Sequence, residues 1–540
     1  MLRLRLLLRP SVVVAGILAV VAFACTTEKL VFRDPFNPPP DANGKFLGYF
    51  TVADKQTTCG NCHVNHQAQW VTTKHASAWA DLQNSGHAQP FCNNCHTVSQ
   101  NGNLATAPAG YAAVPDSVYQ DVQCESCHGA GLTHVQTPDD HDTWPIAHVD
   151  LADSVASCAG CHNGNFDPFF EQWSQSKHAD SAGNALPASE PSCVGCHRGQ
   201  DALARLSGNA PTNYVELTGA KSLTITCAVC HDPHGSPFEG QLRAPINSTD
   251  RTVNLCTQCH FRNTTPSSSF TTSTATVVSR GAHAAQGGVF FGEGAGYIPV
   301  GFVYDTNQVF TSHASPTANP RLCAGCHVSR FTVTDSSGTV QFQSVGHLFL
   351  PIPCVDAQGV PNAGDCGFTT AERNWSACSN SGCHASQDVA QSLFTNERQN
   401  IANLVNQLWT DDGVIGTGGE PYIDPATDTG LLPTLVASNP VDPVTGKKAF
   451  DGTDNYISPA EGALFNAMML GESLYSHHDG SFGVHNPFFA EALLAASIQS
   501  VQTTYSLPDV SPKVQAIMRR ALSRPGVSYR VPRLTQVSKR

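Results

Sequence analysis

Residues 59–79 read CGNCHVNHQAQWVTTKHASAW and combine two cysteines, a histidine directly after the second cysteine, and a further histidine downstream. A Cys-x-x-Cys pair alone is compatible with a zinc site or a redox disulfide, so its meaning depends on what the chain repeats. The whole Cys-x-x-Cys-His motif occurs eight times, and one wider copy, CSNSGCH, follows. The cysteine pairs are Cys59 and Cys62, Cys92 and Cys95, Cys124 and Cys127, Cys158 and Cys161, Cys193 and Cys196, Cys227 and Cys230, Cys256 and Cys259, Cys323 and Cys326, and Cys378 and Cys383.

A histidine follows the second cysteine in every copy, although histidine supplies only 23 of the 540 residues. Paired zinc knuckles supply four thiolates and have no use for this histidine, which argues against structural zinc. A c-type haem needs all three side chains, because both thiols bond covalently to the porphyrin and the adjacent imidazole binds the iron. The sequence therefore predicts nine covalently attached haem c groups. Their proximal iron ligands are His63, His96, His128, His162, His197, His231, His260, His327 and His384.

Histidines outside the motifs are candidate distal ligands. His75 follows Trp70 by five positions, and His178 follows Trp173 by five, each just past a haem motif; a surface histidine beside an aromatic residue is the alternative for a single instance. Methionine cannot serve nine irons, because the chain has only four. We therefore expect low-spin, bis-histidine haems. The expected distal ligands are His75, His87, His134, His178, His234, His283, His313, His347 and His485. The spare histidines, any of which can displace one of these, are His66, His141, His148, His477 and His478.

The N-terminal sequence MLRLRLLLRPSVVVAGILAVVAFAC places three arginines before an apolar run and is typical of a secretory signal peptide. Export agrees with haem c attachment, and compartments outside the cytoplasm also permit disulfides. Because small Ala24 precedes Cys25, we expect a lipoprotein signal with Cys25 acylated. Ala22 and Phe23 depart from the usual lipoprotein pattern, which leaves two alternatives: ordinary cleavage with Cys25 as a spare thiol, or an uncleaved anchor helix.

Two cysteines remain after 18 of the 21 are assigned to haem motifs and Cys25 to the signal. They are Cys354 and Cys366 in the stretch PCVDAQGVPNAGDC. We predict that they form a disulfide across this glycine- and proline-containing loop.

Composition limits both the core and the partners. Charged residues make up 14% of the chain, against a typical quarter, and the chain has 44 glycines and 35 prolines. Such a chain builds little regular core of its own, so we expect a mainly α fold with extensive irregular structure and a haem-stacked core. The formal charge is −13, and loss of the three signal arginines makes it −16, which argues against nucleic acid and anionic membrane surfaces as partners.

An internal repeat divides the haem-motif part. Six positions of the first module recur 99 to 103 residues later as Cys158, Trp173, His178, Cys193, Cys227 and His234. The near-constant offset predicts a duplicated three-haem module, whereas the third set of motifs is interrupted by the Ser/Thr-rich stretch NTTPSSSFTTSTATVVS. We expect a signal peptide at 1–24, a proline-rich tether at 25–50, three-haem modules at 51–155 and 156–250, a third haem region at 251–385 and a haem-free helical region at 386–540.

Helix signals fill the haem-free region. SPAEGALFNAMML begins with Ser458 as N-cap, Pro459 at the first helical position and Glu461 placed for a capping box. NPFFAEALLAASIQSV and SPKVQAIMRRAL begin in the same way, and DVAQSLFTNERQNIANLVNQLW is a fourth candidate helix. We expect a C-terminal helical bundle that closes over the last haems.

The motifs resemble those of known cytochromes. The CxxCH, Trp and KHA arrangement resembles the cytochrome c-552/c-554 family, which shares its haem packing with hydroxylamine oxidoreductase and pentahaem nitrite reductase. CAVCHDPHGSPFEGQL and LCTQCH are similar to the doubled-CxxCH motif domain, which implies that His234 is a ligand. DGSFGVHNPFFAEALL resembles a helix entry near the carboxyl end of the superfamily, which implies the same for His485. The resemblance implies haems stacked in parallel and perpendicular pairs.

The functional expectation is electron transfer by a nine-haem c-type cytochrome, across the periplasm or at the outer membrane. The expected partners are redox proteins or a terminal electron acceptor, with the membrane reached through the N-terminal lipid anchor. One alternative is a multihaem oxidoreductase of nitrite, hydroxylamine or sulfur oxyanions with one five-coordinate haem. The lysine-containing CxxCK motif of pentahaem nitrite reductases is absent, because every motif ends in histidine. Another alternative is a subunit of a cytochrome filament in which one copy ligates a haem of the next.

Overall fold

The computed structural model describes residues 44–147, 157–164, 166–187, 192–208, 222–262, 264–266, 281–309, 311–379, 382–410, 412, 423–471 and 479–530. The signal, Cys25, most of the tether and the spare histidines His148, His477 and His478 lie outside these residues. Within them the fold is mainly helical with extensive irregular structure and few strands, as predicted. None of the helices described is both long enough and apolar enough to cross a bilayer.

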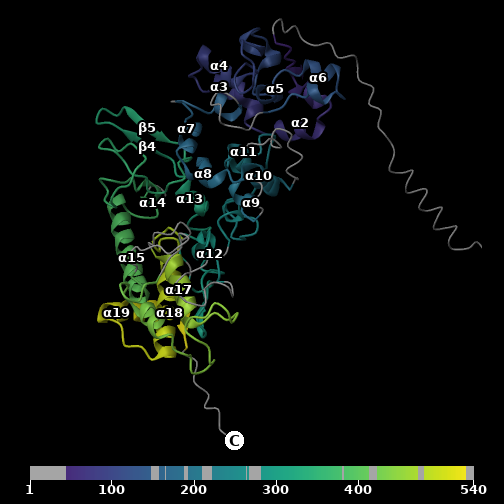
Figure 1. Ribbon diagram of the computed structural model, residues 1–540. Helices are drawn as coiled ribbons and strands as arrows, with labels where there is room; N and C mark the ends of the chain where they lie inside the picture. Colours follow the sequence, from purple (N-terminus) through teal and green to yellow (C-terminus); the bar gives the residue numbers. More distant parts are fainter. Residues whose placement is uncertain are drawn as a thin grey trace, which may run out of the picture.

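The molecule is elongated, with short helices at the N-terminal end and long helices at the C-terminal end (Figure 1). The α-helices of the haem-motif part are α2 (Val64–Trp70), α3 (Ala78–Asn84), α4 (Asn93–His96), α5 (Cys124–His128), α6 (Leu132–Gln136), α7 (Phe169–Ser174), α8 (Ser181–Asn184), α9 (Val194–His197), α10 (Gly199–Ser207), α11 (Cys227–Cys230), α12 (Gln286–Phe291), α13 (Cys323–His327) and α14 (Ser376–Ser379). Several of the cysteine motifs coincide with such helices, and the motifs at Cys59, Cys158 and Cys256 form 3₁₀ turns. A helical turn suits the motif, because residues three apart lie on the same face.

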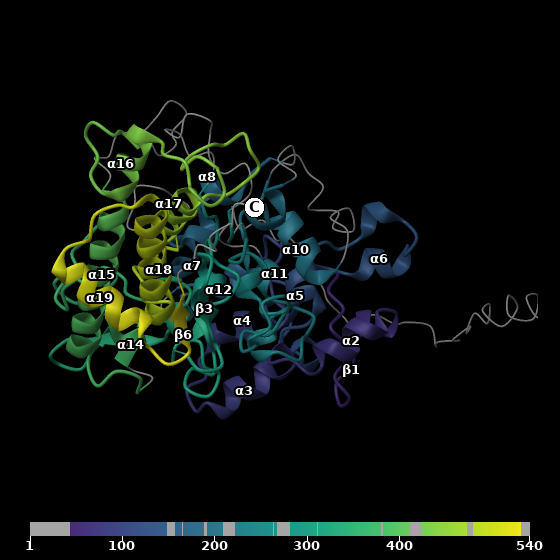
Figure 2. The same ribbon diagram turned by 90° about the horizontal axis from the view of Figure 1, so that it is seen from below.

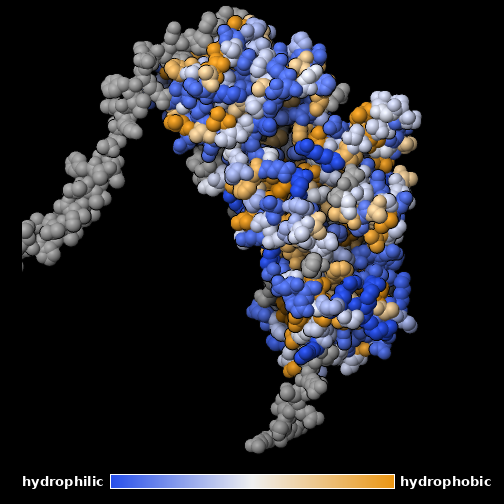
Figure 3. All heavy atoms as spheres, turned by 180° about the vertical axis from the view of Figure 1, so that it is seen from behind, coloured by the Kyte–Doolittle hydropathy of each residue, from blue (hydrophilic) through white to orange (hydrophobic). Residues whose placement is uncertain are grey.

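Apolar clusters in the haem-motif part are small. Tyr49, Trp70 and Ala76 form one cluster, and Ala159 and Trp173 form another. The polypeptide here is therefore a series of short elements around separate local cores. Figure 3 shows apolar side chains scattered over the rear face rather than gathered in one patch.

The first two modules share their internal contacts as well as their sequence pattern. The Trp70 indole donates a hydrogen bond to the carbonyl of Val122 at 2.9 Å, and the Trp173 indole donates to the carbonyl of Ile225, also at 2.9 Å. The Val122 amide in turn donates to the carbonyl of His75 at 3.1 Å, and the Ile225 amide donates to the carbonyl of His178 at 3.2 Å. Each tryptophan thus ties the segment that carries a distal-ligand candidate to the segment just before the third haem motif of its module.

Long helices form the C-terminal region, where α15 (Gln387–Leu408), α17 (Pro459–Leu470), α18 (Pro487–Tyr505) and α19 (Pro512–Leu522) pack together beside α16 (Leu431–Ser438) (Figures 1 and 2). Their largest apolar cluster is fully buried at its centre and includes Leu404, Leu464 and Leu493, each 0% exposed.

Three helix starts predicted from sequence are confirmed. Ser458 and Glu461 form the reciprocal capping box of α17. The side chains of Asn486 and Ser511 cap α18 and α19, each followed by proline at the first helical position. Each cap accepts a hydrogen bond from a backbone amide of the first turn, which has no partner within the helix. The fourth predicted helix, α15, is also present, whereas α16 was not predicted.

The strands of the described residues form two-stranded antiparallel pairs: β1 (Tyr49–Thr51) with β2 (Gln56–Thr57), β4 (Phe331–Thr334) with β5 (Val340–Ser344), and β3 (Phe302–Tyr304) with β6 (Val527–Tyr529). The β3–β6 pair joins the third haem region to the end of the C-terminal helices. Gly301 precedes β3 with φ +89°, and a Cβ there would lie 2.0 Å from the carbonyl oxygen of Arg530. Only glycine fits this approach.

Candidate haem sites

Eight of the nine motif histidines lie opposite a second histidine. We number the motifs 1 to 9 in chain order, from Cys59 to Cys378. The ring centroids of these eight pairs are 5.8 to 6.3 Å apart. The pairs, in motif order, are His63 with His134, His128 with His234, His162 with His75, His197 with His283, His231 with His347, His260 with His178, His327 with His485, and His384 with His313.

This spacing fits two imidazoles on opposite sides of one iron. With metal–imidazole bonds of about 2.0 Å and a ring centroid about 1.1 Å behind the ligating nitrogen, two trans imidazoles have centroids about 6.2 Å apart. Direct contact between two rings would bring the centroids closer, as in the 4.6 Å separation of the tilted His66 and His234 rings. All eight second histidines belong to the set predicted as distal ligands.

The pairs follow a crossed pattern between modules. His75 of the first module lies opposite the histidine of motif 4, which begins the second module, and His178 of the second module lies opposite that of motif 7. In the other direction, the histidine of motif 3 is paired with His234 of the second module, and that of motif 6 with His347 of the third haem region. Six of the eight pairs join different segments of the chain.

The pattern also relates motifs 8 and 9 to the repeat. His313 lies opposite the histidine of motif 9, as His75 and His178 lie opposite the first motif of the following module. Motif 9 is thus arranged like the first motif of a further module. Motif 8 is arranged like motifs 3 and 6, because its histidine pairs with a downstream residue, His485.

Hydrogen bonds at Nδ1 leave Nε2 as the atom that is free to bind a metal. Among the proximal histidines, Nδ1 lies within hydrogen-bond distance of backbone carbonyl oxygens in motifs 2, 3, 5, 6 and 8, at 2.6 to 3.2 Å. Among the distal candidates, Nδ1 of His313 and His347 does the same with Val484 and Val345. A carbonyl accepts only from a protonated nitrogen, which fixes the tautomer and leaves Nε2 with a free lone pair.

Two histidines bond to carboxylates instead. His162 of motif 4 bonds to Asp167, and His485 bonds to Asp479 at 2.7 Å. Burial alone lowers the pKa of His485, but the charge of Asp479 more than offsets this, and the pKa is raised. Neither aspartate was predicted from sequence; the Asp-Gly-Ser turn six residues before His485 was a usable signal.

Burial keeps several imidazoles neutral, the form that binds iron. It lowers the pKa of His75, His178, His327 and His347 to about 4. These four side chains are therefore uncharged at neutral pH.

His96 of motif 2 differs from the rest. Within the part of the chain that the structure describes, it has no imidazole at the separation found in the other motifs. His87, one of the predicted distal ligands, is exposed on the loop after α3. Of the spare histidines, His66 lies 6.2 Å from His63, the same separation as in the eight pairs, and also packs against His234. His141 packs against Trp144 with ring centroids 4.2 Å apart.

The motif thiols form a series in which direct contacts alternate with longer-range electrostatic interactions. Thiol contacts join motif 1 to 3, 4 to 6 and 7 to 8, and electrostatic interactions relate motif 3 to 4, 6 to 7 and 8 to 9. Motif 2 joins this series at its side through Cys95 and Cys161 of motif 4, and motif 5 joins through Cys196 and Cys259 of motif 7. Because a thioether sulfur is separated from the porphyrin by one carbon atom, such contacts fit haems with adjacent edges.

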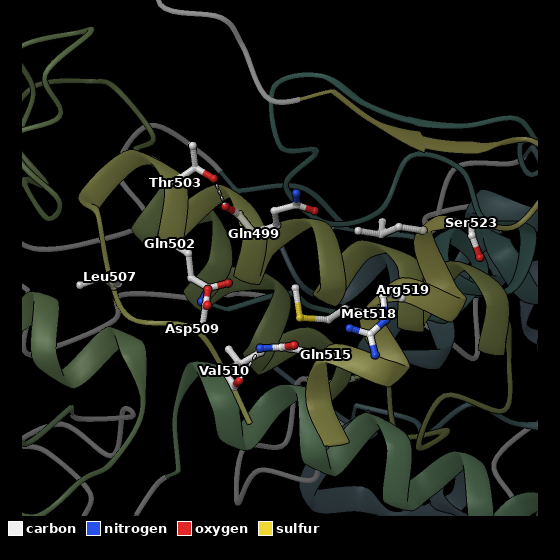
Figure 4. Close-up of a pocket in the computed structure, with 11 residues that line it drawn as sticks. Gln499, Gln502, Thr503, Leu507, Asp509, Val510, Gln515, Met518, Arg519 and Ser523 are labelled. Carbon is white, nitrogen blue, oxygen red and sulfur yellow. Dashed lines mark hydrogen bonds between the residues drawn. The ribbon is translucent and has the colours of Figure 1, made fainter. Parts of the chain in front are cut away.

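Two other features lie apart from the motifs. Cys354 and Cys366 are joined by a disulfide, with their Cα atoms 6.0 Å apart. A depression of about 650 Å³ lies between the end of α18 and α19 and is lined by residues such as Gln499, Asp509 and Met518 (Figure 4). None of the predicted site residues lines it.

Two family descriptions match parts of the chain. Cytochrome c554 and c-prime matches residues 58–129, and the doubled CXXCH motif matches residues 222–264. These matches confirm the resemblance to multihaem c-type cytochromes that the sequence predicted.

Curated relatives point to the same class. The chain is 24% identical to the multiheme cytochrome MtrA of Shewanella baltica (strain OS185), over 38% of this chain and 52% of that protein. It is 26% identical to the C-type polyheme cytochrome OmcC of Geobacter sulfurreducens, over 32% of this chain and 29% of that protein. The chain thus spans about half the length of the first relative and less of the second. No solved structure matches significantly. The motifs and the relatives together support covalently bound haem c.

Proposed function

We propose that this protein transfers electrons through nine covalently bound haems stacked as its core. The observation that carries the proposal is the set of histidine pairs at the spacing of two trans ligands, and the thiol contacts and electrostatic interactions that relate neighbouring motifs from 1 to 9 support it. Haem c, when bound, supplies reversible one-electron chemistry at iron. The motif cysteines hold each group in place, and paired histidines keep both axial positions filled.

The order of these contacts and electrostatic interactions favours a line with two side branches. Motifs 1, 3, 4, 6, 7, 8 and 9 form the line, and motifs 2 and 5 are attached to it at equivalent places. Electron tunnelling falls steeply with distance, so a route needs each motif adjacent to the next. Motifs 4, 6 and 7 have no substitute in this route, whereas motifs 2 and 5 are not needed for end-to-end transfer.

The two ends of the line are the accessible places for partners. Cys62 of motif 1 and Cys383 of motif 9 are exposed, whereas the other motif cysteines are only partly exposed. We infer that electrons enter at one of these motifs and leave at the other, in exchange with redox proteins or a terminal acceptor. The same proposal places the mature protein in the periplasm or at the outer membrane, held by acylated Cys25 and the proline-rich tether.

The test is a count of haems and of their spin states in the oxidised holoprotein. Pyridine haemochrome and intact mass give the stoichiometry, and electron paramagnetic resonance separates low-spin from high-spin iron. The proposal expects nine haems, with low-spin signals from at least the eight motifs whose histidines are paired. Fewer than nine haems in fully matured protein, or several high-spin irons, contradicts it.

For the oxidoreductase alternative, motif 2 is the place to look for an iron with an open position. His96 is the motif histidine for which no paired imidazole is recorded among the described residues, and Phe91 beside it is 59% exposed. If one iron is high-spin, and its signal shifts on addition of nitrite, hydroxylamine or sulfite and is lost in the variant Cys92→Ala/Cys95→Ala, the alternative replaces the simple carrier.

A further inference from the structure

Asp479 is hydrogen-bonded to His485, the distal-ligand candidate of motif 8. Its carboxylate accepts a hydrogen bond from Nδ1 of His485 at 2.7 Å, and the ring centroid of His485 lies 6.2 Å from that of His327. The Asp479 side chain is only 2% exposed, and that of His485 is 18% exposed. The contact is therefore a buried carboxylate–imidazole pair.

The loop between these two residues is built to keep them together. The hydroxyl and amide of Ser481 both donate to the Asp479 carboxylate, and the Ser481 hydroxyl oxygen also accepts from the His485 amide. Gly483 has φ +88°, and a Cβ there would lie 2.7 Å from Ile401 of α15. The α15 helix thus fixes the loop from outside, so the carboxylate cannot turn away from the imidazole without loss of these contacts.

The charge of Asp479 is not balanced by a nearby base. Among the described residues the structure records no lysine or arginine within salt-bridge distance of it. The contrast is Asp232 beside His234 of the motif 3 pair, which lies farther from Nδ1, at 3.5 Å, and also pairs with Arg243 at 2.9 Å. Most of the remaining Nδ1 atoms with a recorded partner face a neutral carbonyl.

We propose that Asp479 is a positioning and redox-tuning residue that lowers the reduction potential of the motif 8 haem. A carboxylate that accepts from Nδ1 raises the basicity of the imidazole, and a buried negative charge near iron favours the ferric state. The same effect is weaker at motif 4, where Asp167 bonds to His162 but is 37% exposed and better screened by water. This inference rests on the proposed haem ligation by His327 and His485.

The experiment is spectroelectrochemical titration of the holoprotein with Asp479→Asn. Asparagine keeps the shape and an acceptor oxygen but removes the charge. We expect one haem's share of the absorbance change to move to higher potential, with the haem count and the low-spin signals unchanged. The matched control is Asp232→Asn, for which we expect a smaller shift, because Arg243 already offsets the charge there.

Two results overturn the inference: fully loaded Asp479→Asn protein with unaltered potentials, or an equal shift in Asp232→Asn. If Asp479→Asn does not acquire its haems, Asp167→Asn decides, because the Asp167 side chain is partly exposed and its replacement is less of a threat to folding. We expect a smaller upward shift of one haem there, and no shift refutes the tuning effect. Failure of the proposed function looks different, since the wild-type protein would then lack the low-spin iron of motif 8.

Discussion

Replacement of His178 by glycine tests the crossed pattern directly. His178 lies in the second module, but its ring faces the histidine of motif 7 at 6.2 Å, in the next segment. Its carbonyl still accepts from the amide of Ile225, so a glycine keeps the backbone contact. We expect the variant to fold, since glycine costs only about 1 kcal/mol in a helical position.

The structure predicts how many haems change spin state in this variant. His178 has one imidazole partner within trans-ligand distance, so its loss opens a single iron. One haem of the nine therefore changes from low-spin to high-spin, and its potential rises, because bis-histidine ligation favours the ferric state. Added imidazole fills the space left by the side chain and restores the low-spin signal.

Electron paramagnetic resonance with and without imidazole is the assay, and the chain offers matched controls. The spare histidine His141 stacks on Trp144 at the surface, and His141→Gly should leave every signal unchanged. Addition of Cys256→Ala/Cys259→Ala to His178→Gly removes motif 7 and should abolish the new high-spin signal. An unchanged spin count in His178→Gly, or a high-spin signal that persists without motif 7, refutes the crossed assignment.

Three further sets of substitutions test a disulfide, a helix cap and a buried carboxyl group outside the haem motifs. Cys354→Ser/Cys366→Ser opens a disulfide with a sequence separation of 12 and should cost about 3 kcal/mol in the chain-entropy picture, measured by denaturant unfolding; an equal midpoint would contradict this. Ser458→Ala removes the cap of α17 and should lower its stability by about 1 kcal/mol, measured by hydrogen exchange; unchanged protection would contradict it. Burial and the nearby Glu491 raise the pKa of Glu397 to about 9, so its proton stabilises the fold at low pH and stability falls as pH rises from about 4.5 toward 9. Glu397→Gln should flatten that decline in thermal unfolding, and an unaltered pH profile would count against the assignment.

Local patterns explain what the sequence alone predicted. The Cys-x-x-Cys-His motif and the capped helix starts depend on residues within one or two turns, so their spacing is visible in the chain. Trp70 and Trp173 were also recognised as equivalent from their spacing, and in the structure the indole of each donates to a backbone carbonyl at the equivalent place of its module. The sequence did not predict which motif histidine each distal candidate would face. The spacing between two histidines along the chain does not say whether they meet in the fold.

Other features depended on context that the sequence does not express. Asp479 and Asp167 act through contacts of Nδ1, and no motif marks them. The helix α16 and the β3–β6 pair form where the chain packs against α17 and α18, far away in sequence. The distal role of His87 remains a prediction, because among the described residues it is not paired with any motif histidine.

The crossed histidine pairs make each repeat incomplete by itself, as in solenoid proteins, where every unit relies on its neighbours. With the proposed ligation, such an array would lengthen by whole units, because a new unit would receive one axial ligand from its predecessor and give one to it. His134 pairs with the motif 1 histidine inside the first module, whereas the motif 8 histidine pairs with His485 at the entry of α18. On this proposal the C-terminal helices would supply the ligand that a neighbouring repeat supplies at motifs 3 and 6.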